Sequence, residues 1–119
     1  MSTAGTWTLV CPLEGLTVER GAAALVNGQA VAVFRTHDDA VYAIGNHDPF
    51  SKASVLARGI VGTRTVEGQG DIPFVASPMH KQAFDLRTGR CLDDESVSVP
   101  SYDVRVVDGM VHIGPRLSP

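Results

Sequence analysis

Short apolar runs separated by turn-forming residues dominate the chain. Runs rich in β-forming residues occupy positions 6–10, 22–26, 29–34, 41–44, 60–63, 72–76, 82–86, 103–107 and 110–113. No segment keeps apolar residues at a period of 3.6 over three helical turns, which an amphipathic helix would need. About nine short strands bounded by turns predict an all-β fold, an antiparallel sandwich or a partly open barrel.

Two dipeptides predict tight hairpins. Asn27-Gly28 and Asp108-Gly109 each separate two apolar runs. A type I′ turn requires positive φ at both central positions, and Asn-Gly and Asp-Gly supply it at low cost. A further turn at residues 37–40 leads into the next run, so the region from Ala22 to Ile44 is predicted as three sequential antiparallel strands.

Other segments carry weaker signals. Residues 12–16 support no more than one helical turn. The Gly-rich stretch 65–71 is expected to be a flexible connection. Pro73 lacks a backbone donor, which predicts an edge position for its strand. Residues 116–119 are expected to form a loose tail.

Length and charge limit the function classes. The 119 residues fit one domain, residues 1–119. The net charge is -3, from 10 basic and 13 acidic residues, and no basic stripe occurs, so neither a nucleic-acid partner nor a membrane surface is expected. No leader-like segment and no apolar run of about 20 residues is present, which predicts a cytoplasmic protein. Cys11 and Cys91 are far apart, with no Cys-x-x-Cys pair, and are expected to be free thiols.

The candidate chemistry lies in two loops. Asp48-Pro49-Phe50 follows the run 41–44, and Ser77-Pro78-Met79-His80 follows the run 72–76. In each loop a proline directly after a small or acidic residue stiffens the backbone. Two rigid loops at strand ends can face each other across a site.

The order of features resembles the Rieske family. Its two cluster loops have the patterns Cys-Pro-His and Cys-Pro-x-His, followed here by Phe84-Asp85 and Thr88-Gly89. The resemblance implies a Rieske-like antiparallel fold. A Rieske [2Fe–2S] centre needs two thiolates and two imidazoles, and the matching positions here hold Asp48, Phe50, Ser77 and His80. Only the histidine is a competent ligand, so the resemblance implies a chain without the cluster.

Within this group, four motifs are similar to the small subunits of assimilatory NAD(P)H-dependent nitrite reductase. They are Gly45-Asn46-x-Asp48-Pro49-Phe50-Ser51, Arg58-Gly59-Ile60-Val61-Gly62, Ser77-Pro78-x-x-Lys81-Gln82 and Gly89-Arg90-Cys91-Leu92-Asp93-Asp94. The resemblance implies a non-catalytic subunit with no cofactor of its own. The large subunit is then expected to carry FAD, a [4Fe–4S] cluster and sirohaem and to reduce nitrite to ammonium.

Each loop residue also has a simpler interpretation. The carboxylate of Asp48 is expected to cap backbone N–H groups in its turn. Phe50 is predicted to be largely buried as a plug between the loops, and Ser77 to hydrogen-bond within its own loop. His47, Asp48 and His80 form a mixed zinc site if the loops meet, with exposed histidines as the alternative. No orienting carboxylate or oxyanion hole for a Ser77 nucleophile is evident, which argues against hydrolase chemistry.

The same loops suggest a docking face. The residues expected to contact a partner surround the four former ligand positions and are Pro49, Ser51, Lys52, Met79, Lys81 and Gln82. Lys81, Arg87 and Arg90 are cations around the same loop pair and could present a small positive face to an acidic partner surface, although solvated turn charges would look the same. Two alternatives stay open: a Rieske-type electron-transfer protein, and a stand-alone binding domain that uses the vacated cluster site.

Overall fold

The structure is a computed structural model that describes residues 7–68, 70–79 and 81–117. These residues form eleven β-strands and two 3₁₀ turns, and no α-helix occurs among them. The prediction of an all-β fold is therefore confirmed. In chain order the elements are β1 (Thr8–Pro12), η1 (Leu13–Gly15), β2 (Arg20–Val26), β3 (Gln29–Arg35), β4 (Val41–Gly45), β5 (His47–Asp48), β6 (Ala53–Ser54), η2 (Leu56–Arg58), β7 (Ile60–Val66), β8 (Gly70–Ala76), β9 (Ala83–Asp85), β10 (Ser101–Val107) and β11 (Met110–Arg116).

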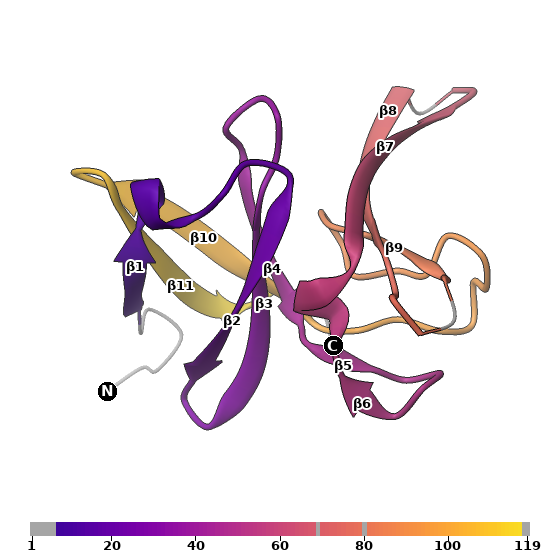
Figure 1. Ribbon diagram of the computed structural model, residues 1–119, viewed down its shortest axis with the longest axis horizontal. Helices are drawn as coiled ribbons and strands as arrows, with labels where there is room; N and C mark the ends of the chain where they lie inside the picture. The colour runs from indigo at the N-terminus through magenta and orange to yellow at the C-terminus, as the bar shows by residue number, and fades with distance from the viewer. Residues whose placement is uncertain (1–6, 69, 80, 118–119) are drawn as a thin grey trace.

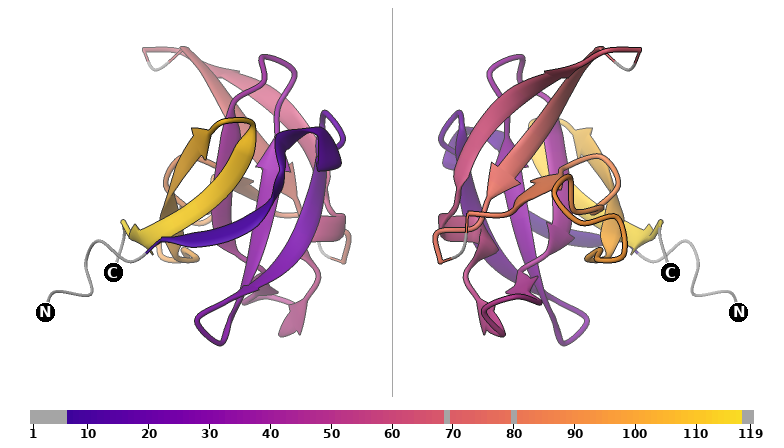
Figure 2. Two further views of the ribbon diagram at one scale, coloured as in Figure 1. Left: turned by 90° about the vertical axis from the view of Figure 1, so that its left-hand side faces the viewer. Right: turned by 90° about the vertical axis from the view of Figure 1, so that its right-hand side faces the viewer.

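A six-stranded antiparallel sheet forms the larger part of the fold. Its order is β1-β11-β10-β4-β3-β2, and it curls into an open barrel whose first and last strands are the two free edges (Figure 2, left). Strands β2, β3 and β4 form the predicted meander, paired in direct sequence. The two predicted hairpins are also confirmed. Asn27 and Gly28 have φ of 50° and 79°, and Asp108 and Gly109 have φ of 51° and 75°.

A smaller sheet of order β7-β8-β9 and the β5-β6 ribbon lie beside the barrel (Figure 1). β7 pairs with β8 as far as Thr65 with Asp71 and Val66 with Gly70, so the prediction of a flexible connection is wrong for these four residues. The predicted edge position of Pro73 is also wrong, because β8 is the middle strand. The proline is tolerated because the β8–β9 ladder begins one residue later, at Phe74, while the Pro73 carbonyl still accepts the N–H of Leu86 at 2.9 Å.

Two hydrophobic clusters fill the molecule. One fills the barrel and includes Val31, Val33 and Ile113. The other joins the two sheets: Phe34 of β3, Leu56 of η2 and Phe84 of β9 belong to it, and all three are fully buried. The 3₁₀ turn η2 therefore connects the barrel to the small sheet, and the paired loops described below sit on that connection.

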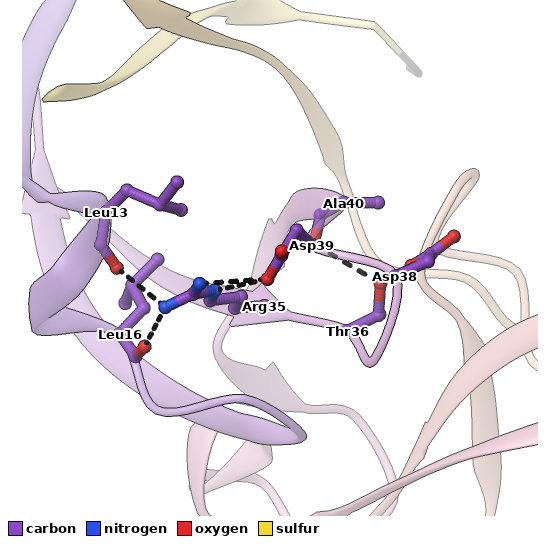
Figure 3. A network of polar contacts seen from close by, with 7 residues as sticks. All are labelled: Leu13, Leu16, Arg35, Thr36, Asp38, Asp39 and Ala40. Carbon is purple, nitrogen blue, oxygen red and sulfur yellow. Dashed lines mark hydrogen bonds and ion pairs between the residues drawn. The ribbon is translucent and has the colours of Figure 1, made fainter. Parts of the chain in front are cut away.

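Arg35 fixes the connection between η1 and β2. Its Nη1 donates to the carbonyl of Leu16 at 3.1 Å, and its Nε donates to Asp39 Oδ1 at 3.0 Å (Figure 3). In the same turn Thr36 Oγ1 donates to the carboxylate of Asp38. One side chain at the end of β3 thus holds both the chain that enters β2 and the β3–β4 turn.

The expectation of a loose tail from residue 116 is wrong for its first two residues. Arg116 is the last residue of β11, and the N–H of Leu117 donates to the carbonyl of Ser101 at 2.8 Å. Residues 118 and 119, like Thr6 in the first predicted strand, lie outside the described residues. None of the helical segments in the described part is long and apolar enough to span a membrane.

Candidate functional site: the paired loops

The first loop, residues 48–52, is organised by the carboxylate of Asp48. This side chain is fully buried at the end of β5. Its Oδ1 accepts the N–H of Phe50 at 2.9 Å, and its Oδ2 accepts the hydroxyl of Ser51 at 3.0 Å. The N–H of Lys52 then closes the loop on the carbonyl of Asp48 at 2.7 Å. The interpretation of Asp48 as a turn-capping residue is confirmed.

The second loop, residues 77–81, has the same plan. The buried Ser77 Oγ accepts the N–H of Met79 at 3.2 Å, and the carbonyl of Ser77 accepts the N–H of Lys81 at 2.9 Å. Lys52 and Lys81 occupy equivalent positions and both adopt left-handed backbone conformations, with φ of 59° and 64°. His80 lies outside the described residues. In both loops the residue before proline therefore binds the backbone two and four positions later.

The two loops meet through their first residues. Ser77 Oγ donates to Asp48 Oδ2 at 2.5 Å, across 29 positions of sequence and in a buried environment. The expectation that Ser77 hydrogen-bonds within its own loop is confirmed by the N–H of Met79. The sequence did not show that the same hydroxyl also donates to the buried carboxylate opposite, which as a charged group is a strong acceptor. The expectation that the loops face each other is confirmed.

Hydrogen bonding outweighs burial at Asp48. Burial is the largest single influence on this carboxyl and by itself raises its pKa, since it disfavours the charge. The hydrogen bonds from Ser77, Phe50 and Ser51 favour the ionised form and together hold the pKa of Asp48 below its usual value. The paired loops therefore contain a buried carboxylate that is charged at neutral pH.

Phe50 closes one side of this arrangement. Its ring packs against Phe84 of the main core, with ring centroids 6.2 Å apart and the planes inclined at 53°. The side chain has intermediate exposure and packs against the main hydrophobic cluster, so burial of the ring against the core is confirmed, while its role as a plug between the loops stays a prediction. One face of the ring covers the core, and the remainder stays open to solvent.

The residues present do not fit a Rieske cluster. Of the four positions matched to cluster ligands, Phe50 has no ligand atom, and the side-chain oxygens of Asp48 and Ser77 are bonded to each other. The mixed zinc site of His47, Asp48 and His80 stays a prediction, because His80 lies outside the described residues. His47 is exposed, and no group of three metal-binding side chains occurs in residues 7–68, 70–79 and 81–117. Cys11 and Cys91 are free thiols, as predicted.

The residues predicted for a docking face surround the loops. Lys52, Met79 and Lys81 are exposed, the methionine by 60%. Pro49, Ser51 and Gln82 are half-buried. The face therefore offers two exposed cations and one exposed apolar side chain, together with three less accessible residues.

Sequence reasoning missed two residues that position the loops. Asn46 follows β4; its Oδ1 accepts the N–H of Ala57 at 2.8 Å, and its Nδ2 donates to the carbonyl of Ser54 at 3.4 Å. Asp93 Oδ2 accepts the N–H of Ala83 at 2.8 Å, just after the second loop. The position of Asn46, a polar residue directly after an apolar strand, was a signal in the sequence that its side chain has a structural role. For Asp93, nothing in the neighbouring sequence indicated that it binds the N–H of Ala83.

Comparison with known proteins shows which family the chain belongs to. Residues 6–114 match the family model of the Rieske-like [2Fe-2S] domain. Over 108 residues the chain is 45% identical to the "Nitrite reductase (NADH) small subunit" of Salmonella typhimurium, covering 90% of this chain and 95% of that protein. The Escherichia coli K12 protein of the same name is 44% identical over the same shares. The chain belongs to the family of nitrite reductase small subunits.

Solved structures of this family have the same fold. A crystal structure from Mycobacterium tuberculosis, described as an NADH-dependent nitrite reductase small subunit, superimposes with a TM-score of 0.84 at 46% identity, covering 92% of this chain and 94% of that one. The ferredoxin of carbazole 1,9a-dioxygenase from Nocardioides aromaticivorans gives 0.77 at 29% identity, covering 92% and 98%. This chain therefore shares its fold with that ferredoxin as well.

Proposed function

We propose that this nitrite reductase small subunit carries no iron–sulfur cluster and supports a large subunit that holds the redox cofactors. The observation that carries this proposal is the hydrogen bond between Asp48 and Ser77. It joins the loops at the two positions where the resemblance places thiolates, so the loop pair keeps its geometry without metal. The cofactors FAD, [4Fe–4S] and sirohaem are then those of the large subunit.

A fused relative supports the partnership. The chain is 36% identical over 108 residues to part of the "Nitrite reductase [NAD(P)H] large subunit" of Klebsiella oxytoca, and this match covers 91% of the chain but 11% of that longer protein. A domain similar to this chain therefore lies in the same polypeptide as a large subunit in that organism. The separate chain is expected to bind a large subunit without a covalent link.

The paired loops are the proposed docking face. Lys52 and Lys81 are exposed, and the backbone N–H of each closes its loop. Met79 of the second loop offers an exposed apolar side chain. Cations together with an apolar contact suit a partner surface that has acidic and apolar groups. Because the backbone on both sides is closed by internal hydrogen bonds, docking should cost little ordering entropy.

Iron content tests the cluster-free part. The purified chain, expressed with iron and sulfide supply, is expected to be colourless and to contain no stoichiometric iron. Visible absorption with two irons per chain would instead support the Rieske-type electron carrier. Binding of one zinc per chain would support a stand-alone domain that uses the vacated site.

A charge reversal tests the docking face. Lys81→Glu is expected to weaken binding to the large subunit by about 1 to 3 kcal/mol, measured by pull-down and titration and followed by an NAD(P)H-dependent nitrite assay. Arg105→Glu is the matched control, because Arg105 lies on β10 and stacks over Trp7 at 4.3 Å, remote from both loops in sequence and contacts. Intact binding by Lys81→Glu would place the interface elsewhere, and full assembly and activity without the small subunit would refute the subunit role.

A further inference from the structure

A cavity of about 550 Å³ lies outside the paired loops, where the start of β2 approaches the start of β7. Its lining includes Arg20 of β2, Arg58 of η2, and Ile60 and Val61 of β7. None of the residues that line it belongs to either loop. Ala57 and Arg58 of the turn η2, which lies between the barrel and the small sheet (Figure 1), are among its lining residues. We call this cavity the β7 groove.

One wall of the β7 groove is an unpaired strand edge. β7 is the outer strand of the small sheet, and among the described residues its one ladder is with β8. The carbonyl of Pro73 accepts from Leu86, on the β9 side, so its β7 partner Thr63 directs its own N–H and C=O away from β8. By the alternation of a β-strand, Val61 and Thr65 do the same. An edge of this kind can pair with an added extended strand.

The opposite wall leaves less room for such a strand. At Gly21 of β2, a Cβ atom would lie 2.5 Å from the carbonyl oxygen of Ala57. η2 therefore packs directly against the backbone of β2. The accessible edge is that of β7, which continues beyond the cavity through the exposed residues Thr63 and Thr65.

The groove is also cationic and partly apolar. Arg20 and Arg58 are exposed, and neither guanidinium has an ion-pair or hydrogen-bond partner among the described residues. Glu19 also lines the groove, and its carboxylate lies 3.7 Å from His37 Nδ1, so the two arginines leave an excess of one positive charge among the lining residues. Ile60 is 73% exposed. Two unpaired arginines beside an exposed isoleucine and an open strand edge favour an extended segment with acidic and apolar side chains.

We propose that the β7 groove binds an extended acidic segment of the nitrite reductase large subunit, which adds as a strand to the edge of β7. This inference rests on the proposed function and adds a second contact, separate from the paired loops. The segment's carboxylates pair with Arg20 and Arg58, and an apolar side chain of the segment covers Ile60. The net charge of the whole chain is -3, so this local excess of positive charge would also select where the segment docks.

Residue-level amide exchange tests the strand addition. In the free chain the amides of Val61 and Thr63 are expected to exchange rapidly, while those of Gly62 and Arg64, bonded to β8, are protected. In the complex with the large subunit, the exchange of Val61 and Thr63 should slow by at least about tenfold. Protection confined to the paired loops would overturn the inference and leave the proposed function standing, whereas failure to form any complex would overturn both.

Charge reversal tests the nature of the segment. Arg20→Glu combined with Arg58→Glu is expected to weaken binding about 10- to 100-fold, with Arg105→Glu again as the control. If the double reversal impairs folding, judged by circular dichroism, Arg20→Gln with Arg58→Gln replaces it and should weaken binding by at least about threefold. If the folded double variant bound the large subunit with unchanged affinity, the proposal of an acidic segment would be overturned. This would hold even if the amides of Val61 and Thr63 were protected in the complex.

Discussion

Truncation of Asp48 tests whether its hydrogen bonds hold the paired loops together. Asp48→Ala removes an acceptor that is fully buried and serves three donors, from Phe50, Ser51 and Ser77. A hydrogen bond to a charged group contributes about 1.5 to 3 kcal/mol. The half-buried Ser51 hydroxyl can turn to water, whereas the Ser77 hydroxyl is 1% exposed and loses its buried acceptor. We therefore expect a loss of about 3 to 5 kcal/mol in the free energy of unfolding.

Urea and thermal unfolding, followed by circular dichroism, measure this loss. For a chain of this size it corresponds to a fall in Tm of about 10 to 20 °C. Asp94→Ala is the matched control, because the Asp94 carboxylate also accepts two hydrogen bonds from Ser96 but is exposed; its Tm should stay close to that of the wild type. A double-mutant cycle with Ser77→Ala should show coupling of at least about 1 kcal/mol. The reasoning would be refuted if the losses in unfolding free energy of Asp48→Ala and Ser77→Ala were additive in the double variant. It would also be refuted if Asp48→Ala were as stable as the Asp94→Ala control.

Three further predictions address the surroundings of the loops. Phe50→Ala is expected to cost about 1.5 to 2.5 kcal/mol, roughly half the loss for a fully buried ring, because Phe50 is half-buried against Phe84; an unchanged urea midpoint would contradict that packing. Leu56→Ala should cost about 3 to 4 kcal/mol, since Leu56 is fully buried where η2 joins the sheets, and a loss under about 1 kcal/mol would mean that this junction contributes little. Because the folded-state pKa of Asp48 is lowered, its stabilisation is present above the unfolded pKa of about 4 and is lost as the pH falls through the folded value. The stability gap between wild type and Asp48→Asn should thus be constant from about pH 5 to 8 and shrink below about pH 4; a gap that widens on acidification would reverse the assigned direction.

Local residue chemistry was sufficient for much of the fold. The turn dipeptides Asn27-Gly28 and Asp108-Gly109 fix two hairpins, because few residues tolerate positive φ at both central positions. The absence of a helical period excluded long helices. The same local reasoning failed at Pro73, since a proline inside a middle strand is tolerated only where a neighbouring ladder ends.

The sequence also located both loops and identified Asp48 as a turn cap, because an Asx residue before proline acts on its own backbone. It did not reveal that Ser77 donates to that carboxylate, or that Asn46 holds the first loop against η2. These contacts join residues far apart in the chain or in different elements, so their partners depend on how the two sheets pack. The open edge of β7 likewise exists only once the strand order is set, because an edge is a property of a sheet and not of a strand.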